Sequence, residues 1–461
     1  MPYYIINIES LVVPVDIIFK HEKPLYIELY LALEDMINKG ILKPDTKMPS
    51  KRLLSIDLDI SLNTVMEAYE MLKDEGYIYT IEKKGYFVQR QPSLSIKPKS
   101  KEIVINNDIN YKYDFTTKSI REFDNKSLNK IVRDLLNDNS YLNKSPMLGD
   151  NSLKDAIKDH LKNNRGIDVL SSNIIITSGM EGLKNVLDLI DINTIYLENP
   201  GYHKIKDIVS NKDIKYISLD NKGVLVPNEK CILYTTSFNQ FPLGIRMTVD
   251  RKKELIEFAN KTSSYIIEDD FDTEFRINSK PVIPLYKFDS NHTIFFSSFS
   301  TTMFPGLRIS YIVLPNDLLK LYIDKYKNES NPVSTLMQLA LAKYIDEGLY
   351  ARSCNKIKRL YLNKRTKLIN ELLKYKIFKP DEKKNYISLL VDLKLNIDID
   401  KLISYLKDNS INIKSIKDYD INKKNSNTLI LGYTNISYDE IDDAVLYLYN
   451  KINEYVCKKE A

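Results

Sequence analysis

At 461 residues, with 43% hydrophobic and 28% charged side chains, the chain is a globular protein too long for one ordinary hydrophobic core, so we expect two or more domains. Its formal net charge is only +5, so bulk electrostatics do not mark it as a nucleic-acid binder. Three scattered cysteines without metal or disulfide spacing favour a reducing cytoplasm, and we expect no signal peptide, no bound metal and no membrane partner.

Helical periodicity marks the first part of the chain. Residues 25–39 repeat apolar side chains at helical spacing. Ser50 is placed to cap a short second helix and Ser61 a third, because a serine hydroxyl accepts a hydrogen bond from a free N–H group of the first helical turn. Two short strands follow, joined by a charged turn that ends in Gly85. Three helices and a hairpin in this order predict a winged helix-turn-helix over residues 15–90.

The pattern changes after this module. Residues 91–110 contain two prolines, serines and lysines without sustained periodicity, which is typical of a linker. From residue 111 onward, short apolar runs alternate with helical stretches, as in an α/β fold whose mostly parallel sheet is covered on both faces. We therefore predict a large α/β domain over residues 111–458, of which residues 355–458 form a smaller α+β subdomain.

The N-terminal module carries a specific resemblance. The segments LKPDTKMPSKRLLS, ISLNTVMEAYEMLKDEGYI and KKGYFV resemble the DNA-binding domain of the GntR family across nearly its whole length. In a helix-turn-helix, the recognition helix enters the major groove. The resemblance therefore implies double-stranded DNA as a partner.

The predicted DNA contacts come from three places in this module. The first residues of the third helix meet base edges and phosphates. Two cations at the start of the second helix neutralise backbone charge, and the hairpin tip reaches the neighbouring groove. In that order, the predicted residues are Ser61, Asn63 and Thr64, then Lys51 and Arg52, then Lys83, Lys84 and Gly85.

Two features restrain this prediction. Between Lys20 and Arg90 there are 11 Lys and Arg and 12 Asp and Glu, a net charge of −1, so the basic charge must be concentrated on one face. Leu62 stands where the family often has arginine, which removes one expected DNA contact. Taken singly, SLNT is a helix cap and the turn lysines are solvated charges, but the ordered set of features favours DNA binding.

The large domain resembles a fold-type-I aminotransferase, and the fusion as a whole resembles the MocR-type regulators of the GntR family. Six landmarks occur in order between residues 111 and 455. They read MLGDNSLKDAIKDHL, ITSGMEGL, YLENPGY, TTSFNQFPLG, IIEDDFDTEFR and SFSTTMFPGLRISYIVLP. The resemblance implies pyridoxal phosphate as the cofactor and a homodimer as the assembly.

The resemblance also implies a set of pocket residues. The turn at Gly179, Met180 and Glu181 opens a helix whose N–H groups can hold the cofactor phosphate, and Arg308 matches the arginine that pairs with it. Tyr202 matches an aromatic residue that stacks on the pyridine ring. Asp269 matches the carboxylate that keeps the pyridine nitrogen protonated.

Three departures set this chain apart from the working enzymes. Thr301 stands where the family has the lysine that forms an imine with the cofactor, and a threonine hydroxyl cannot replace an amine in that step. Phe271 replaces a tyrosine whose hydroxyl contacts the phenolic oxygen of the cofactor. Ile430 falls where relatives place an arginine for the substrate carboxylate. We therefore predict that the pocket is catalytically inactive.

Three functions stay open at this point. The favoured one is a transcription regulator whose aminotransferase-like domain forms dimers and senses an effector. The second is an active aminotransferase with an appended DNA-binding module, and the third is an interaction protein that does not bind DNA. For the pocket, the sequence allows pyridoxal phosphate held without a covalent bond, another small anion, or no ligand at all.

Overall fold

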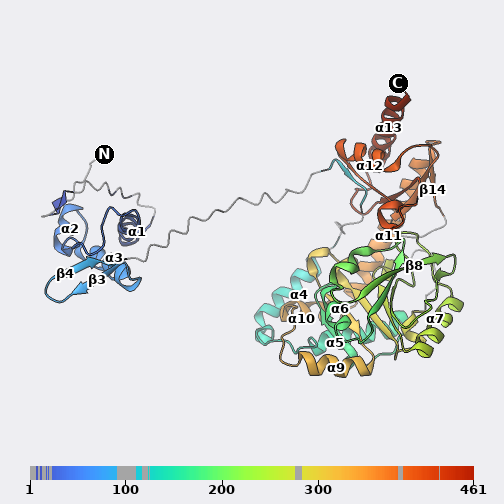
Figure 1. The fold of residues 1–461 in the computed structure, drawn as a ribbon, viewed down its shortest axis with the longest axis horizontal. Helices are drawn as coiled ribbons and strands as arrows, with labels where there is room; N and C mark the ends of the chain where they lie inside the picture. The colour runs from blue at the N-terminus through green and yellow to red at the C-terminus, as the bar shows by residue number, and fades with distance from the viewer. Residues whose placement is uncertain are drawn as a thin grey trace. The chain divides into compact units, whose positions relative to one another are not determined.

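The chain divides into two units, residues 1–106 and 107–461 (Figure 1). The computed structural model describes residues 7–8, 11–12, 17, 19, 23–90, 111–116, 123, 125–275, 283–382, 388–424 and 426–460. The predicted linker, residues 91–110, lies outside the described residues, and the domain boundaries that we inferred from composition stay predictions.

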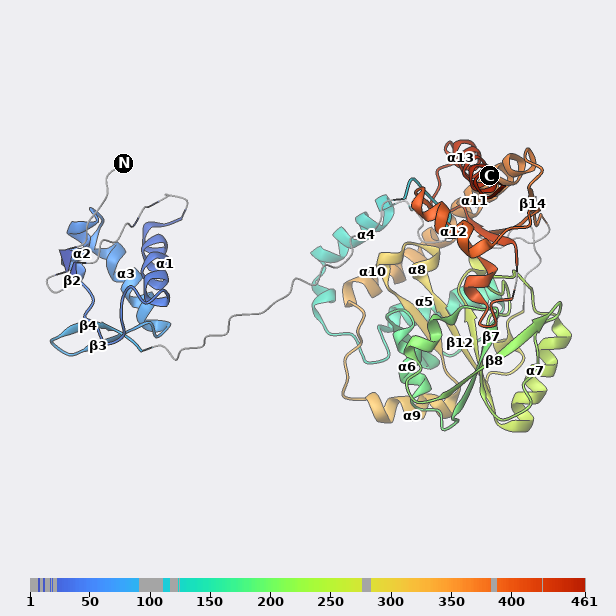
Figure 2. The same cartoon turned by 45° about the horizontal axis from the view of Figure 1, so that its top comes forward.

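The first unit contains the predicted helices and hairpin (Figure 2). Its elements are β1 (Asn7–Ile8), β2 (Leu11–Val12), α1 (Leu25–Asn38), α2 (Lys51–Asp57), α3 (Leu62–Asp74), β3 (Ile78–Ile81) and β4 (Gly85–Val88). The apolar faces of α1, α2 and α3 meet in one core, in which Leu29, Leu54 and Val65 are fully buried. Antiparallel pairing of β3 with β4 forms the wing. The predicted winged helix-turn-helix is therefore confirmed.

Both predicted serine caps are present. The Ser50 hydroxyl accepts a hydrogen bond from the Leu53 N–H at 3.2 Å, and the Ser61 hydroxyl accepts one from the Thr64 N–H at 3.1 Å. These bonds satisfy N–H groups that the helix itself leaves without partners, so the serines fix where α2 and α3 begin.

An eight-stranded sheet forms the centre of the second unit. Its strands run in the order β6-β13-β12-β11-β10-β7-β8-β9. Pairing is parallel throughout the middle, and antiparallel only where β13 meets β12 and β6 and where β9 meets β8. The strands are β6 (Ile174–Thr177), β7 (Thr194–Asn199), β8 (Asp213–Asp220), β9 (Gly223–Val224), β10 (Ile232–Thr235), β11 (Tyr265–Asp270), β12 (Thr293–Ser298) and β13 (Ser310–Val313).

Helices cover both faces of this sheet. On β6, Ile174 and Ile176 pack in a core with α4, α5 and α10, whereas Ile175 packs with α6 and α9 on the opposite face. This alternation explains why the strands read as continuous apolar runs. The helices are α4 (Asn125–Asn137), α5 (Asn151–His160), α6 (Glu181–Leu187), α7 (Val249–Thr262), α8 (Phe299–Thr302), α9 (Asn316–Tyr326) and α10 (Thr335–Asp346). None of the described helices is long and apolar enough to cross a lipid bilayer.

A smaller α+β layer with its own core completes the second unit. Its four-stranded sheet has the order β14-β15-β18-β17. The elements are α11 (Leu349–Leu373), β14 (Phe378–Pro380), β15 (Ser388–Leu393), α12 (Ile399–Asp408), β16 (Ile411–Asn412), β17 (Lys414–Ser415), β18 (Thr428–Gly432) and α13 (Ile441–Glu460). The helix α11 continues through residue 355, where we had placed the start of this layer.

The beginning of the second unit is bound to this smaller layer. The short strand β5 (Tyr113–Asp114) pairs in parallel with β16. Phe115 is fully buried in the core of the layer, and its N–H donates to the Asn412 carbonyl at 2.8 Å. The first described residues after the predicted linker are thus held by the last hundred residues of the chain.

Candidate functional site

The start of α3 presents the predicted DNA-reading residues. The hydroxyls of Ser61 and Thr64 lie 2.9 Å apart and Ser61 also caps the helix, so both are engaged within the first turn. The Asn63 side chain is exposed on this turn, and no described residue hydrogen-bonds to it. Of the three residues, Asn63 has the polar group that is free to meet a base edge.

The start of α2 contributes two cations in different environments. The ammonium of Lys51 lies 3.6 Å from a carboxylate oxygen of Glu70 and 4.7 Å from the ring centre of Tyr86, so it connects α2 to α3 and the wing. Arg52 is exposed, and none of the ion pairs among the described residues involves it. A phosphate could therefore bind the Arg52 guanidinium without breaking an internal contact.

The wing tip carries the remaining predicted contacts. Lys83, Lys84 and Gly85 are all exposed in the turn between β3 and β4. Lys83 has φ 61° and Gly85 φ 108°, both in the left-handed region, so two positive-φ residues make this turn tight. No residue in the described part of the chain forms an ion pair with Lys83 or Lys84, so both ammonium groups can approach an anionic partner.

The predicted phosphate end of the pocket comes from three adjacent strands. Thr177, Ser310 and Ser298 are paired across β6, β13 and β12. Three further residues lie two positions along the chain from this row, just beyond the ends of the three strands. They are Gly179, Arg308 and Ser300.

The guanidinium of Arg308 packs directly against Gly179. A Cβ atom built on Gly179 would lie 2.2 Å from Nη2 of Arg308. The guanidinium is exposed, and no described residue forms an ion pair with it. Met180 caps α6 and Glu181 is its first, exposed residue, so both lie beside this point.

Ser300 was not among our predicted site residues. Its hydroxyl oxygen is buried and has no hydrogen-bond partner among the described residues. A buried hydroxyl without a partner costs free energy, which a ligand oxygen at this place would recover. The second serine of the SFS segment was the available signal.

Asp269 lies at the end of β11 and is buried. The Tyr234 hydroxyl donates a hydrogen bond to its Oδ2 atom, whereas its Oδ1 atom is buried without a partner among the described residues. Burial raises the pKa of the Asp269 carboxyl to about 7, and the charges of Asp270 and Glu198 act in the same direction.

Tyr202, the predicted ring-stacking residue, lies shortly after β7. Its ring is 38% exposed and stands edge-on to Phe241 at a centroid distance of 6.5 Å. Burial raises the pKa of its hydroxyl, the charge of Asp269 raises it further, and the charge of Arg308 lowers it. The charges of Asp269 and Arg308 therefore act on the Tyr202 hydroxyl in opposite directions.

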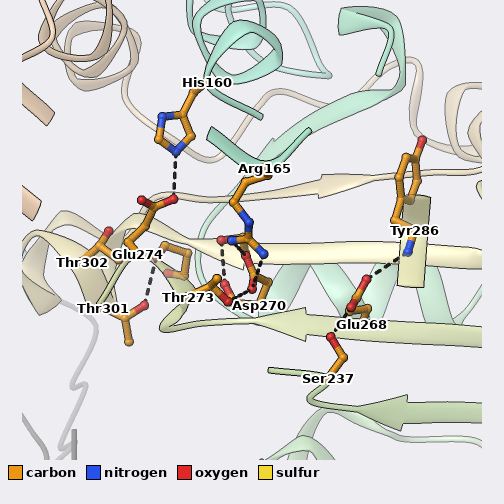
Figure 3. A network of polar contacts seen from close by, with 12 residues as sticks. His160, Arg165, Ser237, Glu268, Asp270, Thr273, Glu274, Tyr286, Thr301 and Thr302 are labelled. Carbon is orange, nitrogen blue, oxygen red and sulfur yellow. Dashed lines mark hydrogen bonds and ion pairs between the residues drawn. The ribbon is translucent and has the colours of Figure 1, made fainter. Parts of the chain in front are cut away.

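Thr301 stands at the position where the resemblance to aminotransferases predicts a lysine. The exposed Thr301 hydroxyl donates to the Ser298 carbonyl at 3.0 Å (Figure 3). The neighbouring Thr302 is buried and accepts a hydrogen bond from the Tyr350 hydroxyl at 2.9 Å. Phe271 is half-buried just beyond β11, and Ile430 is buried in β18.

A polar network beneath the pocket was missed from the sequence (Figure 3). Arg165 forms two hydrogen bonds to the Asp270 carboxylate, at 2.5 and 3.1 Å, with both side chains buried. His160 lies 2.9 Å from a carboxylate oxygen of Glu274. Arg165 and Asp270 are 105 residues apart, so no local pattern could have paired them.

The buried carboxylate of Glu268, on the interior strand β11, links this strand to two neighbouring segments (Figure 3). Glu268 accepts hydrogen bonds from the N–H groups of Leu285 and Tyr286, at 2.9 and 3.1 Å, and from the Ser237 hydroxyl. Burial raises the pKa of Glu268. Among the described residues, no group of three or more His, Cys, Asp or Glu side chains is placed to hold a metal ion.

Comparison with known proteins places this geometry in a family. The family described as "Bacterial regulatory proteins, gntR family" matches residues 25–88. The chain is 30% identical over 447 residues to the HTH-type transcriptional regulator YdeL of Bacillus subtilis, covering 92% of this chain and 95% of that protein. It is 28% identical to the pyridoxine biosynthesis transcriptional regulator PdxR of Corynebacterium glutamicum, covering 74% of this chain and 77% of PdxR. It is 27% identical to MocR of Rhizobium meliloti, named as a "Probable rhizopine catabolism regulatory protein", covering 73% and 75% of the two chains.

Solved structures show the fold of the second unit. An archaeal alanine:glyoxylate aminotransferase superposes with a TM-score of 0.66 at 19% identity, covering 75% of this chain and 92% of that one. A multiple substrate aminotransferase from Thermococcus profundus gives 0.66 at 22% identity, covering 77% and 94%. Both resemblances drawn from the sequence are thereby confirmed. The chain belongs to the GntR family of bacterial transcription regulators, and to its MocR type, in which a winged helix-turn-helix is joined to an aminotransferase-like domain.

Proposed function

We propose that this regulator controls transcription through a pocket that binds a small phosphorylated molecule without forming a covalent bond to it. The observation that carries the proposal is the pocket's composition. Two buried polar atoms, Oδ1 of Asp269 and Oγ of Ser300, have no partner among the described residues, whereas the position of the bond-forming amine holds Thr301. The pocket thus retains groups for binding and lacks the group for imine chemistry.

These residues fit pyridoxal phosphate. Arg308 and the Ser300 hydroxyl would hold the phosphate, with Gly179 leaving room for the guanidinium. Asp269 would accept a hydrogen bond from the ring nitrogen through its unpartnered Oδ1 atom, and Tyr202 would lie against the ring. When bound, the cofactor supplies an electron sink.

The residues that would turn binding into transamination are replaced. Thr301 offers no amine to join the cofactor or to move a substrate proton. Phe271 offers no hydroxyl to the phenolic oxygen, and the buried, apolar Ile430 offers no charge to a substrate carboxylate. The protein is therefore proposed to be a sensor and not an enzyme.

Regulation would follow from thermodynamic linkage between ligand binding and the relative placement of the two winged helices. A ligand that binds one placement of the two winged helices better than another shifts the population toward that placement. We propose a homodimer, since paired half-sites separated by roughly one helical turn of DNA, ~34–36 Å, require two recognition helices. Lys51, Arg52, Asn63, Lys83 and Lys84 would supply phosphate and base contacts.

Covalent trapping tests the pocket. The protein is mixed with pyridoxal phosphate, treated with borohydride and mapped by mass spectrometry. We expect that no pocket residue of the wild type is modified, and that Thr301→Lys gains the modification at residue 301. A modified lysine facing Asp269 in the wild type, or amino-group transfer between an amino acid and a keto acid, would contradict the proposal.

Equilibrium binding separates a sensing pocket from a vacant one. The wild type should bind pyridoxal phosphate reversibly, and Arg308→Ala should weaken binding by at least about tenfold, as expected for loss of a charge-assisted hydrogen bond. If the wild type does not bind it and no other small anion copurifies, the domain serves only to pair two chains.

A further inference from the structure

The outward face of α3 carries two apolar side chains where DNA is expected. Leu62 is 39% exposed and Met66 is 41% exposed, and the two lie one helical turn apart. The opposite face is fully buried in the core of the unit, through Val65, Ala68, Tyr69 and Leu72. Packing among the described residues therefore does not account for Leu62 and Met66.

The charged residues of this helix are also unusual for a DNA reader. Glu70 is held by Lys51 and Lys73, with N–O distances of 3.6 and 3.5 Å. Glu67 is exposed, and no described residue forms an ion pair with it. The sequence of α3 contains no arginine, and its one lysine, Lys73, lies in the last turn.

The chemistry of the major groove gives these side chains a common target. Guanine is usually read by arginine or lysine at its N7 and O6 atoms, which the start of α3 cannot do. Thymine presents a C5 methyl group suited to apolar contact, and cytosine presents an N4 amino group that a carboxylate accepts from. Both groups lie on the pyrimidine side of a base pair.

We propose that this face of α3 reads the pyrimidines of the operator, with Leu62 and Met66 contacting thymine methyl groups and Glu67 accepting a hydrogen bond from a cytosine amino group. The inference rests on the proposed DNA contacts of α3. It also explains how an unpaired carboxylate is tolerated near phosphates, because Glu67 is stabilised only where a cytosine amino group meets it. Phosphate attraction comes instead from Arg52 and from Lys83 and Lys84 of the wing.

Continuity with the helix start favours DNA over a protein as the occupant of this surface. Leu62 directly follows the cap Ser61 and precedes the exposed Asn63, at the end of the helix that enters the groove. The exposed amide of Asn63 beside the two apolar side chains suits the mixed polar and methyl surface of base edges.

Base analogues test the proposal on the full-length protein. Binding sites are selected from a pool of random duplexes, and each thymine of a selected half-site is then replaced by uracil, which lacks only the methyl group. We expect one or two positions at which this replacement weakens binding about fourfold, the effect of withdrawing one methyl group from an apolar contact. In Leu62→Ala, the loss at one of these positions should disappear. Leu31→Ala shortens an apolar side chain on α1 that is also 39% exposed. This variant should lose as much affinity as the wild type does when thymine is replaced by uracil.

A second variant tests the carboxylate. Glu67→Gln should change the preferred base at one position from cytosine to adenine, because a glutamine side chain pairs with adenine N6 and N7. A selected site that tolerates every thymine-to-uracil replacement, but loses binding when guanine is replaced by 7-deazaguanine, would overturn this inference and leave DNA binding intact. If no duplex is selected at all, the proposed function itself fails and this inference fails with it.

Discussion

The guanidinium of Arg308 lies so close to Gly179 that a methyl group on that glycine would stand 2.2 Å from its Nη2 atom. Gly179 also has φ +61°, where a side chain is strained. Gly179→Ala should therefore cost only about 1–2 kcal/mol of unfolding free energy, since the arginine end can move, but should weaken phosphate-ligand binding by displacing it. Calorimetric titration with pyridoxal phosphate measures the second effect.

Gly306→Ala is the matched control for that substitution. A Cβ atom there would meet only Phe304 at 3.9 Å, an ordinary contact. If both variants bind the ligand like the wild type, Gly179 has no role in holding Arg308 for a phosphate.

Asp269 makes the stability of the protein depend on pH. Its pKa rises from 3.8 to about 7 on folding, so between these values the folded protein holds a proton that the unfolded chain has released. The free energy of unfolding should therefore fall as pH rises from about 4 to about 7, by on the order of 4 kcal/mol. Asp269→Asn should remove this part of the dependence and become relatively more stable than the wild type at pH 8, as measured by urea unfolding without ligand. Asp168→Asn, at an exposed site, should leave the dependence in place.

The buried pair of Arg165 and Asp270 should be essential for the folding of the second unit. Arg165→Ala leaves the Asp270 carboxylate without its guanidinium in a dry environment, which typically costs about 3–5 kcal/mol. Lys162→Ala, three residues earlier, breaks an exposed pair with Asp168 at 3.7 Å and should cost less than about 1 kcal/mol. Equal losses of unfolding free energy for the two variants in chemical denaturation would show that the buried pair stabilises the fold no more than the exposed pair does.

The salt dependence of DNA binding should show whether Arg52 contacts a phosphate. Arg52→Ala should lower affinity for all duplexes and reduce the slope of log K against log salt by about 1, since one phosphate contact is lost. Lys39→Ala removes the same charge directly after α1, where Lys39 is paired with Asp35 at 2.6 Å. The slope for this variant should equal that of the wild type. An unchanged slope in Arg52→Ala would place the phosphate contacts elsewhere.

Local chemistry was enough to predict much of the fold. Ser50 and Ser61 cap the helices that follow them, because a serine before an amphipathic run satisfies the first N–H groups. The apolar runs of β7, β10 and β11 read as buried strands because helices cover both faces of the sheet. The resemblance supplied the order of the pocket residues, and sheet register explains why Gly179 and Arg308 meet.

Contacts between distant segments could not be predicted. Tyr234 donates a hydrogen bond to Asp269, 35 residues away in the sequence, and Arg165 donates to Asp270, 105 residues away. Such pairs depend on which strands become neighbours, and neither side chain carries a local signal of its partner. The same holds for Ser300, whose hydroxyl looks ordinary until burial removes water from it.

The pairing of β5 with β16 determines which part of the second unit holds the chain after the predicted linker. Tyr113 and Asp114, the first strand residues after that linker, pair with Ile411 and Asn412 and not with any strand of the large sheet. The chain that follows the predicted linker is therefore anchored in the C-terminal layer. Any change in the position of that layer relative to the large sheet would carry Tyr113 and Asp114 with it.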